Sequence, residues 1–242
     1  MQPFSSFADL LYPPACLLCR SASVASQGAN PLICDECLAA MPRCGPPVCS
    51  SCGVGLPGAF DAVASCAACR KRPRAFDAAR APWRYQGTAQ EAVRQFKYHH
   101  RWRIGRWLAR DMAQTARESL PVQEISLVLP VPLHGLKRWL RGWNPSESLA
   151  RQIAAELGVP CRTRGLRRTR WTRSQTRLSW RRRAQNVRQA FEACSSSIQD
   201  QTILLVDDVL TSGATADSCA AALKQAGARR VFVLAAARTP LD

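Results

Sequence analysis

Four C-x-x-C pairs in the first third of the chain have the residue type and spacing to bind metal ions. A C-x-x-C turn can direct two thiolates at one tetrahedral ion, and two such turns complete a four-cysteine zinc site. We pair the turns consecutively, although the spacing also allows interleaved pairing. Four-thiolate sites leave no open coordination position, so we predict two structural Zn(II) sites. Their ligands would be Cys16, Cys19, Cys34 and Cys37 in the first, and Cys49, Cys52, Cys66 and Cys69 in the second.

Disulfide bonds are a weaker interpretation of these cysteines. No Lys or Arg precedes Arg20, so the basic region of a secretory signal is missing and the cytoplasm is the expected compartment. Residues 1–75 show little regular apolar periodicity, and we expect them to need the metal in order to fold. Cys44, in the Pro/Gly-rich segment CGPPVC, is interpreted as a spare thiol outside both sites.

A second stretch with chemical potential is ILLVDDVLTSGAT at residues 203–215. Backbone N–H groups of a Gly-containing loop at a helix N-terminus can hold a phosphate. Asp207 and Asp208, just before the loop, can accept hydrogen bonds from ribose hydroxyls or approach a metal ion. Additional hydrogen bonds to the phosphate can come from the hydroxyls of Thr211, Ser212 and Thr215. Together these groups predict a site for ribose 5-phosphate; the alternative is a plain strand–turn–helix junction with Thr215 as a helix cap.

Alternating apolar runs and helical patterns must position these residues. Runs of this length that alternate with helices favour βαβ units and a parallel sheet, hence an α/β fold. In such sheets ligands bind at the carboxyl ends of the strands. We expect strands at 81–85, 126–131, 202–206 and 230–237, and helices at 89–116 (with a break near 99–103), 147–157 and 216–226.

Composition and charge divide the chain into two parts. With 242 residues, 47% of them apolar, the chain is not a disordered protein. The formal net charge of +17 is uneven: residues 1–75 carry +2 and residues 76–242 carry +15. We therefore predict a cysteine-rich module at 1–75 and an α/β domain at 76–242. Membrane insertion is not expected, because no apolar run approaches the roughly 20 residues of a spanning helix.

Residues 203–215 resemble the phosphoribosyl-pyrophosphate (PRPP) signature of type I phosphoribosyltransferases, which has four apolar residues, two acids and T-[TS]-G-x-T. The order of motifs along the whole chain is similar to that of the ComF family, phosphoribosyltransferase-like proteins linked to DNA uptake in natural competence. Those motifs are the four C-x-x-C pairs, PVPLH (130–134), RGWN (141–144), TRSQxxL (172–178), RAQNV (183–187) and the PRPP signature.

The resemblance implies a double zinc ribbon followed by a type I phosphoribosyltransferase-like domain that binds PRPP with Mg(II). Catalytic roles would fall to Asp207, Asp208 and Arg183. The family more often has Gln where this chain has Pro145, which cannot make a side-chain hydrogen bond. The implied PRPP-binding residues are Asp207, Asp208, Thr211, Ser212, Gly213, Ala214, Thr215, Val131, Pro132 and Arg141.

Basic and aromatic residues are interleaved at 162–188, which holds eleven arginines, no acid, and both Trp171 and Trp180. Arginines bind phosphates and flat rings stack on unpaired bases, so single-stranded DNA is an expected partner. PRPP also needs several cations, so nucleic acid is not the only explanation of this charge. A second such stretch, residues 94–110, contains Phe96, Tyr98, Trp102 and Trp107, and a third covers residues 137–143. The alternative is solvated helix faces with Trp in the core. The nucleic-acid candidates are Arg167, Arg168, Arg170, Trp171, Arg173, Arg181 and Arg182.

Three functions remain in competition at this level. The first is a ComF-like protein with a PRPP pocket that handles single-stranded DNA, with the DNA-uptake machinery as a partner. The second is an active Mg-dependent phosphoribosyltransferase of nucleotide metabolism, for which no segment identifies the acceptor nucleophile. The third is a zinc-ribbon adaptor that binds another protein through residues 1–75.

Overall fold

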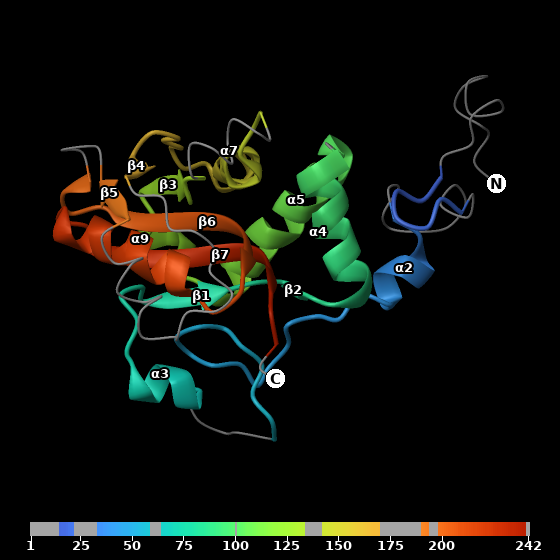
Figure 1. The fold of residues 1–242 in the computed structure, drawn as a ribbon, viewed down its shortest axis with the longest axis horizontal. Coiled ribbons are helices and arrows are strands. Elements are labelled where there is room, and N and C mark those ends of the chain that lie inside the picture. Colours follow the sequence, from blue (N-terminus) through green and yellow to red (C-terminus); the bar gives the residue numbers. More distant parts are fainter. Residues whose placement is uncertain are drawn as a thin grey trace.

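A parallel β-sheet forms the centre of the fold (Figure 1). The structure is a computed structural model that describes residues 15–21, 33–58, 64–99, 101–133, 142–169, 190–193 and 198–240. The strand order is β1-β7-β6-β3, with β2 also paired to β7. All these pairings are parallel. The strands are β1 (Ala78–Arg80), β2 (Trp83–Arg84), β3 (Leu127–Pro130), β6 (Thr202–Leu210) and β7 (Arg230–Arg238).

Strand β6 is apolar on both faces because the sheet is covered on both sides. Ile203 and Leu205 belong to one core cluster, and Leu204 and Val206 belong to the other. All four side chains are fully buried. A continuous run of aliphatic residues, rather than an alternating one, is therefore what this position in the sheet requires.

Helices cover the two faces of the sheet unequally. Residues of α9 (Ala214–Gln225) join the first cluster, whereas residues of α4 (Gly87–His99), α5 (Trp102–Ser119) and α7 (Pro145–Leu157) join the second. Short helices α2 (Asp35–Ala39) and α3 (Ala67–Lys71) lie in the cysteine-rich part, and a 3-10 turn, η2 (Val122–Glu124), precedes β3. Within the described ranges, none of the helices is both long and apolar enough to cross a membrane.

The predicted fold class, a parallel α/β sheet preceded by a four-cysteine module, is confirmed. The expected break in the long helix is also found, between His99 and Trp102. The strand expected at 202–206 instead continues to Leu210, so the two acids lie within the strand and not after it. The strand expected at 81–85 is replaced by β1 and β2, and Pro82, which has no N–H to donate, lies between them.

A small antiparallel pair that the sequence did not indicate lies beside the main sheet. It consists of β4 (Leu166–Arg168) and β5 (Phe191–Ala193). The pair brackets most of the arginine-rich stretch, of which residues 170–189 lie outside the described part of the chain.

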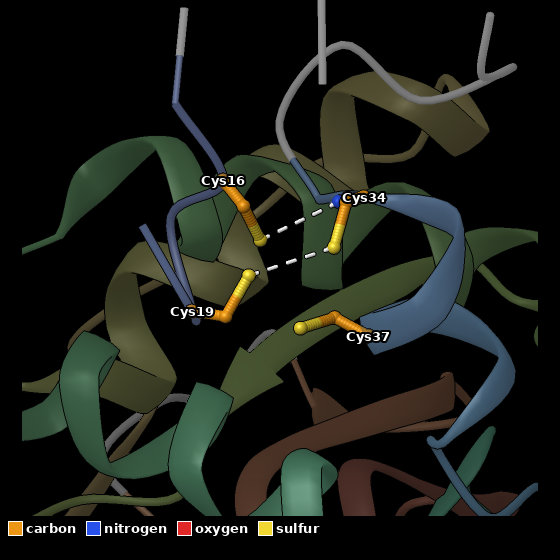
Figure 2. Close-up of side chains that lie close together, drawn as sticks. All are labelled: Cys16, Cys19, Cys34 and Cys37. Atoms are coloured by element: carbon orange, nitrogen blue, oxygen red, sulfur yellow. Dashed lines mark hydrogen bonds between the residues drawn. The ribbon is translucent and has the colours of Figure 1, made fainter. Parts of the chain in front are cut away.

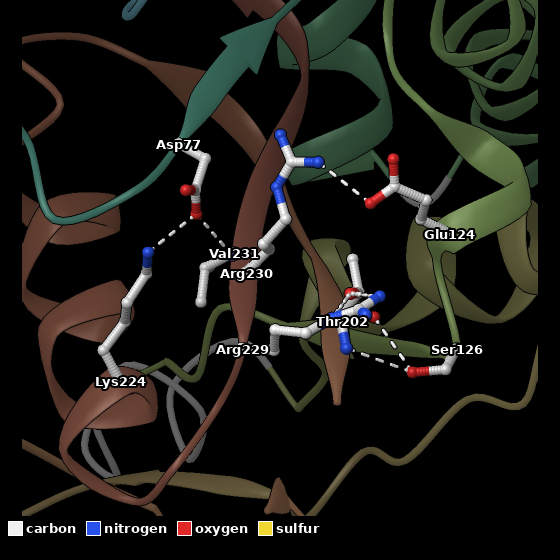
Figure 3. A network of polar contacts seen from close by, with 8 residues as sticks. All are labelled: Asp77, Glu124, Ser126, Thr202, Lys224, Arg229, Arg230 and Val231. Atoms are coloured by element: carbon white, nitrogen blue, oxygen red, sulfur yellow. Dashed lines mark hydrogen bonds and ion pairs between the residues drawn. The ribbon is translucent and has the colours of Figure 1, made fainter. Parts of the chain in front are cut away.

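Polar pairs close the edge of the sheet at which the strands begin (Figure 3). Asp77 accepts a hydrogen bond from the backbone N–H of Val231 at 2.7 Å and pairs with Lys224 at 2.9 Å. Arg230 pairs with Glu124 at 2.9 Å. These contacts hold loops to the sheet at this edge, whereas the acids of β6 lie toward the opposite one.

Candidate functional site

The first four cysteines come together as one cluster (Figure 2). The Sγ atoms of Cys16, Cys19, Cys34 and Cys37 all lie within 4.8 Å of one another, and those of Cys19 and Cys34 are 3.6 Å apart. The N–H of Leu18 and that of Cys34 each donate to Cys16 Sγ at 3.4 Å. A tetrahedral zinc ion with Zn–S bonds of about 2.3 Å sets its sulfurs about 3.8 Å apart, so this cluster has the geometry for zinc.

The second cluster repeats this arrangement with Cys49, Cys52, Cys66 and Cys69. Their Sγ atoms also lie within 4.8 Å of one another, with 3.7 Å between those of Cys52 and Cys66. The N–H of Cys66 donates to Cys49 Sγ at 3.3 Å. Consecutive pairing is therefore correct, and interleaved pairing is excluded.

Both clusters fit structural zinc, since each offers four thiolates and no place for a substrate. In each, the second C-x-x-C turn leads into a short helix, because Cys34 is the N-cap of α2 and Cys66 that of α3. Cys44 lies outside both clusters, as expected, and burial raises the pKa of its thiol to about 11. When bound, zinc would hold the two turns of each ribbon together.

The clusters pack in different places. Cys16 and Cys34 share a small core with Ile33, against which Trp107 of α5 packs. The cysteines of the second cluster instead belong to the same core as α9 and one face of the sheet. The second site is thus continuous with the α/β domain, whereas the first contacts its helical side.

The two acids of β6 are held by contacts from two helices. Asp207 Oδ1 accepts hydrogen bonds from Ser146 Oγ on α7, at 3.1 Å, and from the N–H of Asp208, at 2.8 Å. Lys97 Nζ on α4 lies 2.7 Å from Asp208 Oδ1. The side chains of Lys97 and Asp208 are only 15% and 12% exposed, so this ion pair is buried.

Burial controls the electrostatics of this site. The pKa of Asp207 is raised to about 7, mainly because burial removes water from the carboxylate and secondly because Asp208 is negatively charged. Burial works against the charged form of Lys97, but the charges of Asp208 and Asp207 outweigh it and raise the pKa of Lys97. Near neutral pH the group therefore carries Lys97 as a cation and Asp207 at the midpoint of its titration.

Replacing Asp207 with Asn should make stability less dependent on pH. The folded state keeps the Asp207 proton up to about pH 7, whereas an unfolded Asp loses it near pH 4, so wild-type stability falls as the pH rises through 7. Asn has no such proton but keeps the Oδ1 acceptor. Between pH 6 and pH 8.5, urea unfolding of the zinc-loaded proteins should show D207N gaining about 1 kcal/mol relative to wild type. Parallel pH curves would contradict this prediction.

The loop after β6 has the form expected for a phosphate site. Thr211 and Ser212 are exposed, and Gly213 has a φ of 77°, a conformation that favours glycine. Gly213 is the N-cap of α9, which has no side-chain cap, and Ser212 Oγ accepts a hydrogen bond from the N–H of Ala214 at 3.3 Å. Thr215 lies inside the helix and is not its cap.

The end of β3 is joined to the same site. The N–H of Val131 donates to the Val206 carbonyl at 2.8 Å, and the Val131 carbonyl accepts from Asn144 Nδ2 at 3.0 Å. Asn144 is the N-cap of α7, and Pro145 occupies the first helical position, where a missing N–H has no cost. The unusual Pro145 thus starts the helix that carries Ser146 to Asp207.

The sequence analysis did not find Lys97 or Ser146. A signal existed for Lys97: it follows Val93 by four residues, on a helix face whose other members are apolar and buried. A lysine there needs a buried partner. Ser146 has no comparable signal, because a serine in the first turn of a helix is common for local reasons.

Several predicted residues cannot be placed. Arg141 and Arg183 lie outside the described residues, as do the nucleic-acid candidates Arg170, Trp171, Arg173, Arg181 and Arg182. Two of the candidates are described. Arg167 pairs with Glu192 of β5 at 2.7 Å, and the guanidinium of Arg168 lies 5.4 Å from the centre of the Phe191 ring. Pro132 follows Val131 at the end of β3.

An exposed aromatic surface lies where α4 meets α5. Tyr98 is 59% exposed and Trp102 is 50% exposed. The Trp102 ring lies 4.6 Å from that of Trp143, which in turn contacts Phe96 edge-on at 5.1 Å. Tyr98 follows Lys97 at the end of α4, and Trp143 directly precedes Asn144, the N-cap of α7.

Comparisons with known proteins found a matching family model, related proteins and similar solved structures. Residues 7–72 match the family model of the double zinc ribbon domain. Competence protein F of Haemophilus influenzae is 28% identical over 72% of this chain and 78% of its own length. Among solved structures, the chain is similar to glutamine PRPP amidotransferase from B. subtilis, with a TM-score of 0.40 and 25% identity over 58% of this chain and 30% of that one.

DNA utilization protein YhgH of Salmonella typhimurium is 32% identical over 95% of this chain and 99% of its own length. That alignment includes both the cysteine-rich part and the α/β sheet. The chain therefore belongs to the ComF family, the family of competence protein F and DNA utilization protein YhgH.

Proposed function

We propose that this protein binds PRPP or a related ribose 5-phosphate, with Mg(II), at the carboxyl end of β6, and that it acts on single-stranded DNA during DNA uptake. One observation carries the ligand part of the proposal. A buried strand delivers Asp207 and Asp208 beside a Gly213 loop that opens a helix. This arrangement joins acceptors for a sugar diol to N–H donors for a phosphate.

Each group has a separate task in this proposal. The loop from Thr211 to Thr215 and the first turn of α9 would hold the 5-phosphate, because helix N-termini favour anions. Asp208 would accept from a ribose hydroxyl, and Lys97 beside it would release or share that carboxylate. Mg(II), when bound with PRPP, would neutralise part of the pyrophosphate charge. Arg183 remains a proposed contact of the pyrophosphate, and Arg141 a proposed contact of PRPP.

The DNA part of the proposal is supported by the relatives and by surface chemistry. Competence protein F and DNA utilization protein YhgH are both named for processes that involve DNA. The chain carries a formal charge of +17, and Tyr98 and Trp102 expose ring surface among the basic residues Arg101 and Arg103. Rings that stack on bases within a basic surface are typical of single-strand binding.

Calorimetric titration of Mg-PRPP into the zinc-loaded protein tests the ligand site. We expect saturable binding to wild type and none to D207N/D208N, which loses both carboxylates but keeps their shape. Equal heats in the two proteins would reject the proposed site.

For DNA, binding to an unstructured oligonucleotide should weaken with rising salt. It should also be weaker in Trp102→Ala than in Trp102→Phe, which keeps a stacking ring. Salt-independent or absent binding would reject the DNA role.

Phosphoribosyl transfer is the second candidate, and the acidic pair favours it. In that reaction the carboxylates would stabilise the positive charge that develops at C1′ as pyrophosphate leaves and the acceptor attacks. Release of pyrophosphate that depends on an added acceptor, and that is lost in D208N, would establish it.

We further propose that residues 1–75 and 76–242 act as two modules. In the adaptor alternative, residues 1–75 would be the surface that binds another protein.

A further inference from the structure

The second zinc site and the phosphate loop are joined by one buried arginine. Arg238, at the end of β7, is only 5% exposed. Its Nη1 donates to the carbonyl oxygen of Leu210, at 2.9 Å, and to that of Thr211. Its Nε donates to the carbonyl of Cys52 at 3.2 Å, and its Nη2 lies 3.8 Å from Cys52 Sγ. One guanidinium therefore joins a zinc ligand to the end of β6 and to Thr211, the first residue of the loop.

Further contacts join the same parts of the molecule. Asp217, in the first turn of α9, accepts a hydrogen bond from the N–H of Ala75 at 2.7 Å and lies 3.7 Å from Arg72. Ala75 and Arg72 come just after the last cysteine of the second cluster. On the loop itself, a Cβ built on Gly213 would lie 3.7 Å from the Arg74 guanidinium. The loop and the start of α9 are thus packed against the segment that leaves the second zinc site.

Charge gives this contact a dependence on the metal. A zinc ion with four thiolates has a net charge of −2, which the neighbouring cations Arg238 and Arg80 compensate. Without zinc, the two C-x-x-C turns lose the common centre that holds them together. The Cys52 carbonyl and Sγ, which Arg238 contacts, would then no longer be fixed in place.

The first zinc site has no such connection among the described residues. Its cysteines share a core with Ile33 and pack beside Trp107, on the side of the sheet opposite α9. The two ribbons therefore have different relations to the candidate ligand site, although both have C-x-x-C spacing and four Sγ atoms within 4.8 Å of one another.

We propose that the second zinc site holds the phosphate loop in its binding conformation through Arg238, which is a positioning residue, so that ligand binding depends on zinc at this site and not at the first. This inference rests on the proposed ribose 5-phosphate site. Lys cannot replace Arg238, because a single ammonium cannot reach Cys52, Leu210 and Thr211 at once, as a planar guanidinium with five N–H donors does.

Hydrogen–deuterium exchange of the zinc-loaded full chain tests the coupling without any ligand. In Arg238→Lys we expect the amides of residues 210–216 to exchange at least 10-fold faster than in wild type, with two zinc ions retained. The matched control is Arg230→Lys, the same change at the other end of β7, which should leave the loop unchanged. Unchanged loop exchange in Arg238→Lys would overturn the proposal.

Removal of one zinc ion at a time gives an independent comparison. Cys49→Ser should speed exchange in residues 210–216, whereas Cys34→Ser should speed it only around the first site. Equal effects of the two variants on the loop would overturn the proposal.

Mg-PRPP titration of the same proteins should show at least 10-fold weaker binding in Arg238→Lys and Cys49→Ser. If wild type binds no PRPP, the proposed function fails, while the exchange data still decide the coupling.

Discussion

Replacing Lys97 with Met should lower the free energy of unfolding by about 3–5 kcal/mol, the usual effect of removing one partner from a buried ion pair. Lys97 lies 2.7 Å from Asp208, and Asp207 is the adjacent residue, so the variant would leave two acids without their cation. The measurement is urea unfolding of the zinc-loaded protein at pH 8, above the Asp207 pKa of about 7.

Two further variants test this explanation, a rescue of the buried charge and a control at an exposed ion pair. Asp208→Asn in the Lys97→Met background should recover part of the loss, because it removes one of the two uncompensated charges. Lys224→Met breaks the Lys224–Asp77 pair, which has a similar distance of 2.9 Å but side chains 36% and 27% exposed. Its effect should stay within about 1 kcal/mol. If Lys97→Met were no worse than Lys224→Met, the buried pair would not stabilise the fold.

Zinc removal should have the largest effect of all. Structural zinc sites contribute apparent binding free energies of about 10–16 kcal/mol, and residues 1–75 have little other means of folding. We expect two zinc ions per chain by elemental analysis, one in Cys34→Ser or Cys49→Ser, and two in Cys44→Ser, the matched control. A chelator should lower the thermal midpoint strongly.

Substitutions at the two zinc sites should also differ in their effect on thermal stability. Cys49→Ser should lower the midpoint more than Cys34→Ser, because the second cluster shares the core of the sheet. Loss of a zinc ion in Cys44→Ser would contradict the assignment of ligands, and so would two retained ions in either of the other variants.

Local spacing explains why much of the site was predictable. The eight zinc ligands form C-x-x-C turns, and Asp207, Asp208 and Gly213 lie within seven consecutive residues, so short sequence windows contain their geometry. The strand end was misplaced at Val206, because carboxylates usually end an apolar run. Here β6 continues through them, since it pairs with β7 as far as Leu210.

Contacts between distant segments could not be predicted in the same way. Ser146 reaches Asp207 only because Asn144 fixes the start of α7 against the end of β3. Arg238 is separated from Cys52 by 186 residues, and no local pattern marks it as more than a polar residue ending an apolar strand. Both positions depend on the assembled sheet, which periodicity alone does not describe.

The strand order has a consequence for how the molecule is built. β7 follows every other strand of the sheet in the chain, yet it lies between β1 and β6. During synthesis β1 can therefore pair with β7 only once the chain has reached Val233, which is the register partner of Ala79 and lies 154 residues after it. Until then, the second cysteine cluster lacks Arg238 and one face of its core. Early capture of zinc by the emerging ribbons would protect these thiols while the rest of the chain is made.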